Sequence, residues 1–168
     1  MRVLGIDCGG EYTGYGVVEQ DDLGCLHHVY SGAIRLVARE ALELRLKAIN
    51  DALTQVISVH DPELVAIEDV FYALNAKSAL KLGHVRGVAM LAAAQARLSV
   101  VAYSPLSIKS AVVGYGRAEK SQVQVMVARL LNLSAPPEPP DVADALAIAI
   151  CHLHTAATLQ RQGVTAGK

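Results

Sequence analysis

The pattern of apolar and polar positions predicts three strands at the start of the chain. Apolar and β-branched residues dominate residues 2–8, 13–19 and 26–36, and glycines and aspartates typical of turns separate these runs. The short connections allow consecutive strands to pair with one another. We therefore expect a three-strand antiparallel meander.

The middle of the chain alternates between helix and strand patterns. Apolar residues recur every three or four positions over residues 39–60, which predicts an amphipathic helix. Pro62 ends this helix, because a residue before proline is disfavoured in the helical conformation. Residues 64–68 form a short apolar run typical of a strand buried on both faces, and a second helix over 77–98 precedes a strand over 99–103.

Helices dominate the last third of the chain. A short helix is expected after Pro105 and a longer one over 119–133, and a cluster of prolines separates the latter from a last helix over 141–158. Strands that alternate with helices are typical of α/β proteins. We expect one domain over residues 1–158, with a mixed sheet of three antiparallel and two parallel strands flanked by helices. A flexible tail should follow over residues 159–168.

The composition restricts the class of protein. The chain has 168 residues, of which 52% are hydrophobic and 18% charged, so it can bury one core and is not intrinsically disordered. Its three cysteines, Cys8, Cys25 and Cys151, indicate neither a disulfide framework nor a zinc site. We see no signal peptide and no apolar run of roughly 18 residues that would span a membrane. These features predict a soluble, cytoplasmic protein without a membrane partner.

Charge is distributed unevenly along the sequence. The net charge is −1, yet residues 1–70 carry −7 and residues 71–168 carry +6. A molecule with segregated charge can bind a polyanion such as nucleic acid on one face. A chance distribution of charged residues would give the same asymmetry. Motifs are therefore needed to choose between nucleic-acid binding and chance.

Two candidate metal ligands stand where predicted strands end. Asp7 ends the first strand, and Glu68 ends the buried strand over 64–68. Alone, each could be an ordinary turn or strand-end residue. By strand alternation, the neighbouring Cys8 and Asp69 should point away from the site. Glycines near Asp7 would let a phosphate or a metal ion approach the backbone closely. These glycines are Gly9, Gly10, Gly14 and Gly16.

A second acidic pair, Asp141 and Asp144, opens the last predicted helix. Residues three apart share one helical face, with Cβ atoms about 5–6 Å apart. Asp141 is also a suitable N-cap and Asp144 would complement the helix dipole, so capping is an alternative to catalysis. Four gathered carboxylates supply the oxygen ligands that Mg²⁺ prefers and need cations or protons to neutralise them. Two Mg²⁺ ions about 4 Å apart would clamp the attacking and leaving oxygens of a phosphodiester.

Five segments resemble, in order, the signature segments of the bacterial RuvC Holliday-junction resolvases. They are IDCGGEYTGYGVVE, AIEDVF, NAKSALKLGHVRGVA, VVGYGRAEKSQVQ and PPDVADALAIAICHLH. The resemblance implies an RNase H-like fold and a homodimer that nicks four-way DNA junctions in recombination and repair, with a branch-migration helicase as partner. It implies two Mg²⁺ ions, replaceable by Mn²⁺, at four catalytic acids. These acids are Asp7, Glu68, Asp141 and Asp144. Cys8 and Gly10 depart from the common family pattern, in which proline and serine are frequent.

Cations surround the Gly-Tyr-Gly-Arg loop at 114–117. Lys109 and Lys120 flank this loop and Arg117 lies in it. Cations beside exposed backbone suit phosphate binding, although surface lysines are usually only solvated. The resemblance favours DNA contact for Lys109 and Lys120, and Arg117 is a further candidate.

Phe71 follows the strand-end Glu68 by three positions and is the only phenylalanine of the chain. An aromatic residue is ordinarily part of the core, but a residue in a loop beside the active site can stack on an unpaired base. The segment resembles the junction-reading loop of the family. We therefore expect Phe71 to contact a base, with Asn75 and Lys77 beside it.

The second helix carries a stripe of small and apolar residues, namely Gly83, Gly87 and Leu91. The stripe could pack on the sheet within one chain, whereas the resemblance implies a dimer contact. His152 and His154 end the last helix, where they would complement its dipole or, alternatively, bind metal.

Two other functions compete with a nuclease. Residues 7–14 resemble the first phosphate loop of actin-like phosphotransferases, but the chain has no second glycine-rich phosphate loop. A DNA-binding module without catalytic activity would not need all four acids. We therefore predict a structure-selective endonuclease.

Overall fold

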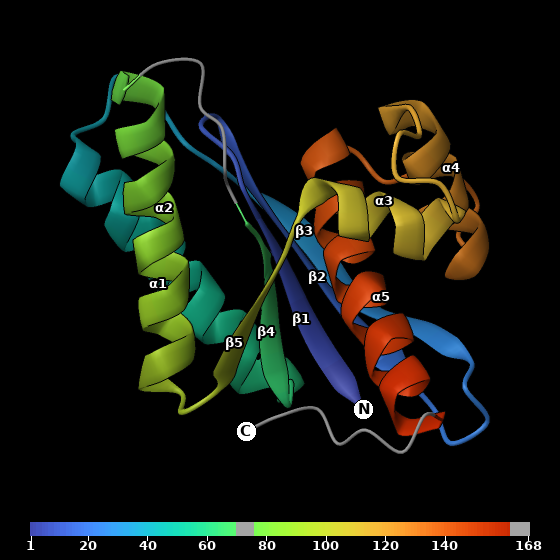
Figure 1. The fold of residues 1–168 in the computed structure, drawn as a ribbon. Coiled ribbons are helices and arrows are strands. Elements are labelled where there is room, and N and C mark those ends of the chain that lie inside the picture. Colours follow the sequence, from blue (N-terminus) through green and yellow to red (C-terminus); the bar gives the residue numbers. More distant parts are fainter. Residues whose placement is uncertain (70–75, 162–168) are drawn as a thin grey trace.

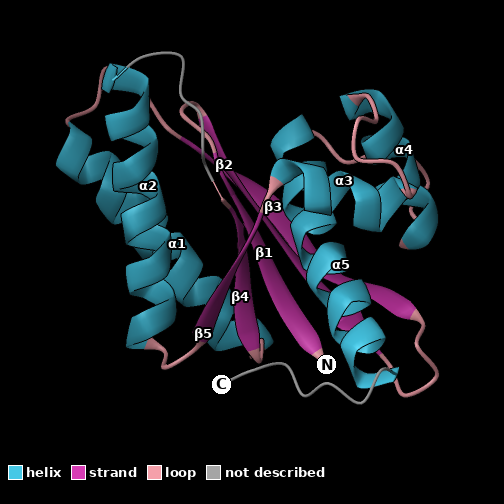
Figure 2. Ribbon diagram, in the orientation of Figure 1, coloured by secondary structure: helices cyan, strands magenta, loops and turns pink. Residues whose placement is uncertain are grey.

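A five-stranded mixed sheet forms the centre of the computed structural model, which describes residues 1–69 and 76–161 (Figure 2). Its strands are β1 (Arg2–Cys8), β2 (Tyr12–Gln20), β3 (Leu26–Arg35), β4 (Leu64–Glu68) and β5 (Ser99–Tyr103), in the order β3-β2-β1-β4-β5. The first three strands pair antiparallel, and β4 and β5 continue the sheet in parallel. The predicted meander with two added parallel strands is confirmed.

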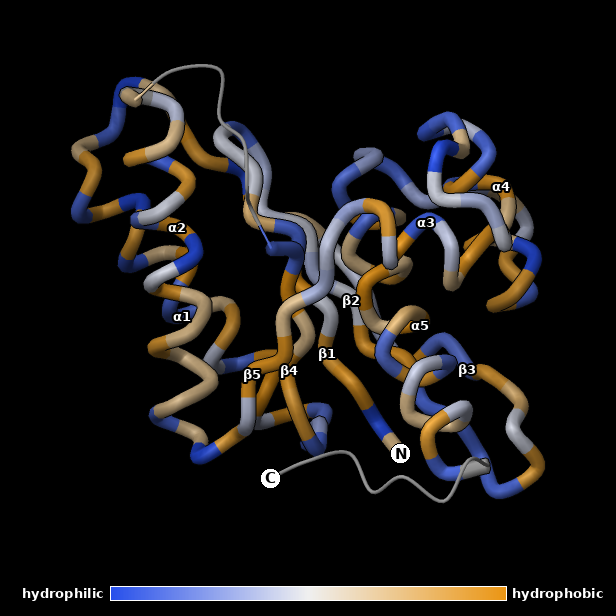
Figure 3. Tube along the Cα trace, in the orientation of Figure 1, coloured by the Kyte–Doolittle hydropathy of each residue, from blue (hydrophilic) through white to orange (hydrophobic). Residues whose placement is uncertain are grey.

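Helices cover both faces of this sheet (Figure 1). They are α1 (Leu42–His60), α2 (Ala76–Gln95), α3 (Pro105–Val113), α4 (Lys120–Leu130) and α5 (Pro140–Arg161). Because side chains alternate along β1, Val3 joins the core under α5, and Leu4 and Ile6 join the core under α1 and α2. Hydrophobic residues run along β1, β4 and β5 between the two helical layers (Figure 3). The sheet is thus buried on both faces.

Helix α5 lies directly on β1 and β2 because glycines leave room for it. A Cβ atom on Gly5 would overlap the carbonyl oxygen of Ala145, and one on Gly14 would overlap the carbonyl of Asp141. Gly16, the ladder partner of Gly5, likewise meets a leucine of the helix. These contacts fix the start of α5 over the end of β1, where Asp7 lies.

The helix boundaries differ from the predicted ones by a few residues. Helix α5 begins at Pro140, so Asp141 lies inside its first turn and is not the N-cap, and Asp144 lies in the second turn. It continues to Arg161, three residues beyond the predicted end. Helix α4 begins after a capping box in which Glu119 is the N-cap. The division into one domain and a short tail stays a prediction.

Among the described helices, α5 alone is long and apolar enough to cross a membrane by composition. Its most apolar window has a mean hydropathy of 1.5, and 61% of that window is buried inside the protein. The helix lies between the sheet on one side and α3 and α4 on the other (Figure 1). A helix enclosed in this way is apolar on most of its surface, so its composition reflects its place in the core.

Candidate active site

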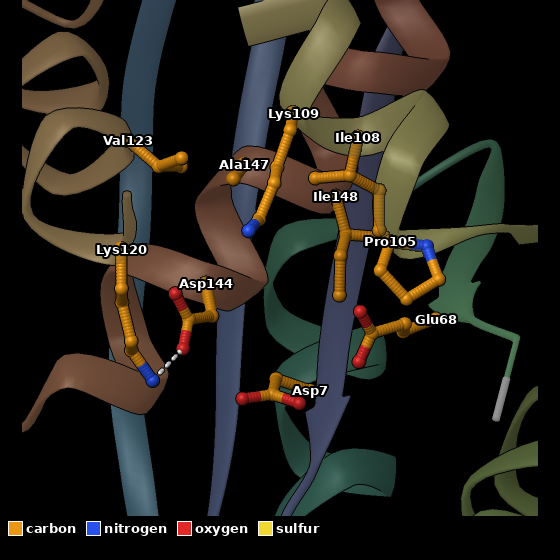
Figure 4. A pocket seen from close by; sticks show the side chains of 10 residues that line it. All are labelled: Asp7, Glu68, Pro105, Ile108, Lys109, Lys120, Val123, Asp144, Ala147 and Ile148. Carbon is orange, nitrogen blue, oxygen red and sulfur yellow. Dashed lines mark ion pairs between the residues drawn. The ribbon is translucent and has the colours of Figure 1, made fainter. Parts of the chain in front are cut away.

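A cavity of about 350 Å³ opens where β1 and β4 end, beneath α3, α4 and α5 (Figure 4). Three of the predicted acids line it, Asp7 from β1, Glu68 from β4 and Asp144 from α5. The predicted DNA-binding lysines Lys109 and Lys120 line it as well. Apolar residues complete the wall, namely Pro105, Ile108, Val123, Ala147 and Ile148. The fold therefore gathers five predicted site residues from five elements around one space.

Asp7 lies on the α5 face of β1, at the last position but one of the strand. Its pKa is raised to about 7, first by burial and then by the charges of Asp144, Glu68 and Asp141, against a smaller opposing effect of Lys120. A carboxylate in this position is ionised only at a free-energy cost. Added positive charge would lower that cost.

Glu68 and Asp144 share this environment. Burial raises the pKa of each, and the charges of Lys120 and Lys109 act in the opposite direction. Lys120 forms an ion pair with Asp144, with 2.5 Å between Nζ and Oδ2 (Figure 4). Burial alone would lower the pKa of Lys120, but this hydrogen bond and the charges of the acids outweigh it and raise the pKa. The lysine thus neutralises part of the acidic cluster.

The fourth acid, Asp141, lies beside the cavity and against the connection between β1 and β2. A Cβ atom on Gly9 would stand 3.0 Å from Oδ1 of Asp141, and one on Gly14 would meet its backbone. The prediction that the glycines open the backbone to a ligand is therefore wrong for Gly9, Gly14 and Gly16, which make room for other parts of the chain. At Gly10 no described atom lies within 4 Å of the added Cβ.

The carboxylates fit divalent cations by charge and by ligand type. Burial and repulsion raise the pKa of Asp7, Glu68 and Asp144, and within the described part of the chain only Lys120 is ion-paired with one of them. Hard oxygen ligands with unbalanced charge are what Mg²⁺ prefers. No three acidic, histidine or cysteine side chains of residues 1–69 and 76–161 converge closely enough to hold one ion. Asp144 points to Lys120, so ion binding would require it to exchange the ammonium for the metal.

Cys8 and Asp69 point to the opposite face of the sheet, as strand alternation predicts. Cys8 packs against the core under α1 and α2. Burial, followed by the charge of Asp7, raises the pKa of its thiol to about 12, so it does not offer a thiolate ligand. Asp69 forms an ion pair of 3.5 Å with Arg86, which also donates a hydrogen bond to the carbonyl oxygen of Glu68. Sequence reasoning did not identify Arg86, although it lies in a signature segment.

The two histidines of α5 have partners away from the cavity. His152 is buried and shares a hydrogen bond of 2.8 Å with the hydroxyl of Tyr103. His154 donates from Nδ1 to the carbonyl oxygen of Ala111, at 2.9 Å. Neither residue lines the cavity. A metal-binding role for them has no support in this arrangement.

The remaining DNA-binding candidates lie outside the cavity or outside the described residues. Arg117 is exposed and does not line the cavity. Phe71 and Asn75 lie outside the described residues, and so does the side chain of Lys77. The expected roles of these residues therefore stay predictions.

The stripe on α2 faces away from the sheet. No described atom lies within 4 Å of a Cβ added to Gly83 or Gly87, and Leu91 is 51% exposed. The helix packs on the sheet through other positions, including Val85 and Ala89. The alternative that the stripe packs on the sheet of the same chain is therefore wrong.

Comparisons with known proteins agree on one family. The family model described as "Crossover junction endodeoxyribonuclease RuvC" matches residues 3–152. A protein of that description from Koribacter versatilis is 70% identical over 161 residues, which cover 96% of this chain and 97% of that protein. One from Acidobacterium capsulatum is 56% identical over 168 residues, covering 96% and 98%. The solved structure "T. thermophilus RuvC in complex with Holliday junction substrate" superposes with a TM-score of 0.86 at 31% identity, over 94% of this chain and 96% of that one.

Proposed function

The chain belongs to the crossover junction endodeoxyribonuclease RuvC family and has an RNase H-like fold, and we propose that it resolves four-way DNA junctions by hydrolysing one phosphodiester in each of two opposed strands. The observation that carries this proposal is the cavity at the ends of β1 and β4, where Asp7, Glu68 and Asp144 face Lys109 and Lys120. Carboxylates suit metal ions and lysines suit phosphates, so the cavity fits a phosphodiester and its cations.

The acids would hold the cations that assist hydrolysis. Two Mg²⁺ ions, or Mn²⁺ in their place, would supply Lewis-acid stabilisation of the attacking and leaving oxygens. The charges of the other three acids raise the pKa of Asp7, so Asp7 would help to hold the ions. Glu68 would complete one side of the site, and Asp141 and Asp144 the other, because the latter two project from the start of α5.

The lysines position the phosphodiester. Lys109 and Lys120 point into the cavity from α3 and α4 (Figure 4). Lys120 pairs with Asp144 in this cavity and would also donate to a phosphate oxygen of the bound strand. Phosphate contacts of this kind orient the backbone and carry no sequence information. Arg117, exposed in the loop before α4, would extend them.

Recognition of the crossover would come from the segment that follows β4. There Phe71 would stack on a base left unpaired at the crossover, and Asn75 and Lys77 would contact the strand beside it. The stacking would keep the DNA unpaired next to the end of β4, which carries Glu68.

Two active sites would act together in a homodimer. The exposed stripe of Gly83, Gly87 and Leu91 supports a contact through α2, because small residues allow two helices to approach closely. A twofold dimer would present one cavity to each of two opposed strands. We further propose that a branch-migration helicase is a partner and that the protein works in the cytoplasm, where the three free cysteines would stay reduced.

Substrate competition tests this function against its two rivals. The protein is incubated with Mg²⁺ and equal concentrations of a four-way junction, a linear duplex of the same sequence, and ATP. We expect symmetric nicks in the junction, an intact duplex and intact ATP. Transfer or hydrolysis of the ATP phosphate would indicate a phosphotransferase, and junction binding without any nick would indicate a binding module. Either result would overturn the proposal.

A further inference from the structure

A second cavity, of about 660 Å³, lies at the same end of the sheet but on its other face, under α1 and α2. Three cations from three elements line it, Arg35 at the end of β3, Arg45 in the first turn of α1, and Lys81 in α2. Gly10 and Glu11, from the connection between β1 and β2, form its near wall. We call this space the basic cavity.

The cations that line the basic cavity outnumber the acidic groups that line it. Among the described residues, none of the three takes part in an ion pair. The Nε atom of Arg45 is buried and has no hydrogen-bond partner within the described ranges. Glu11 contributes the one carboxylate among the lining residues. Three cations outnumber the one carboxylate, so the positive charge of the cavity suits an anion with several oxygen acceptors.

The basic cavity adjoins the active site through a short stretch of backbone. Gly10 and Glu11 follow Asp7 by three and four positions, so this connection separates the two cavities. At Gly10 no described atom would contact an added Cβ, which leaves the backbone open. Figure 1 shows the starts of α1 and α2 at the same end of the molecule as this connection. A nucleic-acid strand that leaves the active site can therefore cross at Gly10.

We propose that the basic cavity binds backbone phosphates of the junction strand that continues from the cut site, through Arg35, Arg45 and Lys81. The inference rests on the proposed function and extends it, because it assigns a second stretch of the same substrate to the opposite face of the sheet. Contacts of this kind would be independent of sequence and sensitive to salt.

Binding of a four-way junction over a range of salt concentrations tests the proposal. The experiment uses the full chain with Asp7→Asn, which removes cutting, and adds Arg45→Gln and Lys81→Gln together. We expect roughly tenfold weaker binding at moderate salt, and a slope of log K against log salt that is lower by about 2, one for each lost phosphate contact. Arg45→Lys keeps the charge and should keep the slope.

Arg97→Gln is the matched control, since Arg97 precedes β5 at the opposite end of the sheet. It removes one positive charge, as each substitution of the double variant does, and should leave affinity and slope unchanged. Equal slopes in the parent protein and the double variant, with both folded by thermal melting, would overturn the inference. So would a loss in the Arg97→Gln control that is equal for each charge removed, because the effect would then follow net charge and not the position of the residue.

Methylphosphonate substitution locates the contact on the DNA. Neutral phosphates are introduced one at a time on both sides of the cut site, and binding is compared between the parent and the double variant. We expect a group of positions outside the cut site at which the parent loses affinity and the double variant does not. If both proteins respond alike at every position, the cavity does not hold DNA.

Two further outcomes separate the possible explanations. If inorganic phosphate stabilises the parent and not the double variant, while junction binding is the same in both, the cavity is a small-anion site and the inference is wrong. A wild-type protein that neither binds nor cuts junctions would overturn the proposed function itself. If the wild type binds and cuts them, an unchanged slope in the double variant would overturn this inference alone.

Discussion

Among single residues, those of the proposed active site show a conflict between charge and burial. Asp7 is mostly enclosed and faces three other carboxylates, and its pKa is raised to about 7 from the ordinary 3.8. The folded protein thus binds a proton more tightly at this position than the unfolded chain does. The ionised form destabilises the fold by up to about 4 kcal/mol, and this cost is complete above pH 7 and absent below pH 3.8.

Asp7→Asn should therefore stabilise the metal-free protein at high pH. With EDTA present, we expect the variant to have the larger free energy of unfolding at pH 8, and the difference from the wild type to shrink as the pH falls towards 5. Urea unfolding at several pH values measures it. Adding Mg²⁺ at pH 8 should raise the melting temperature of the wild type more than that of the variant. A variant that is less stable at pH 8 would contradict the cause assigned to the shift.

His152 should act in the opposite direction. Burial lowers its pKa below 6.5, so the unfolded chain takes up a proton that the folded protein does not. Its contribution to stability is present above pH 6.5 and is lost as the pH falls below that value. We expect His152→Gln to flatten the loss of stability between pH 7 and 5, as measured by urea unfolding. Unchanged pH dependence would show that His152 is protonated equally in both states.

At the scale of elements, contact between α5 and the first hairpin fixes the site. Gly5→Ala would place a methyl group on the carbonyl oxygen of Ala145, and because neither backbone can move far, we expect a loss of about 3 kcal/mol or more in the free energy of unfolding. Gly10→Ala is the matched control, since no described atom would touch its methyl group. Urea unfolding of both variants tests this. Equal stabilities would mean that α5 does not need the glycine.

Structural features that follow from short-period patterns could be predicted from the sequence. Strand alternation correctly predicts that the side chains of Cys8 and Asp69 point away from the acids. The helical period predicts the central part of α1. Two features depend on contacts between distant segments and could not be predicted. One is the role of Gly14 and Gly16, which admit a helix that lies more than a hundred residues later. The other is the basic cavity.

The basic cavity shows why charge counts along the chain are a poor guide to a surface. Arg35 and Arg45 belong to the acidic first part of the sequence, and Lys81 belongs to the basic remainder. The fold brings them to one cavity because β3, α1 and α2 all have an end there. A net charge of −7 over residues 1–70 therefore coexists with a local cluster of cations.

For the whole molecule, paired nicking of a junction requires two copies of the chain. Leu91 is half exposed on α2, at the end of the stripe that contains Gly83 and Gly87. Leu91→Glu should convert the proposed dimer into monomers, because the charge would be buried in the contact. Sedimentation velocity measures the state. We also expect the variant to leave junctions nicked on one strand. A wild type that sediments as a monomer at all concentrations would contradict the proposed arrangement.

We propose that the four acids form the metal-dependent nuclease site of a junction resolvase. Binding and single-turnover cleavage of the same four-way junction by the wild type and by Asp7→Asn in Mg²⁺ test this proposal. Because the substitution keeps the shape of the side chain and removes its charge, we predict unchanged or tighter junction binding with cleavage slower by about a thousandfold or more. Cleavage by Asp7→Asn at the wild-type rate would contradict the account.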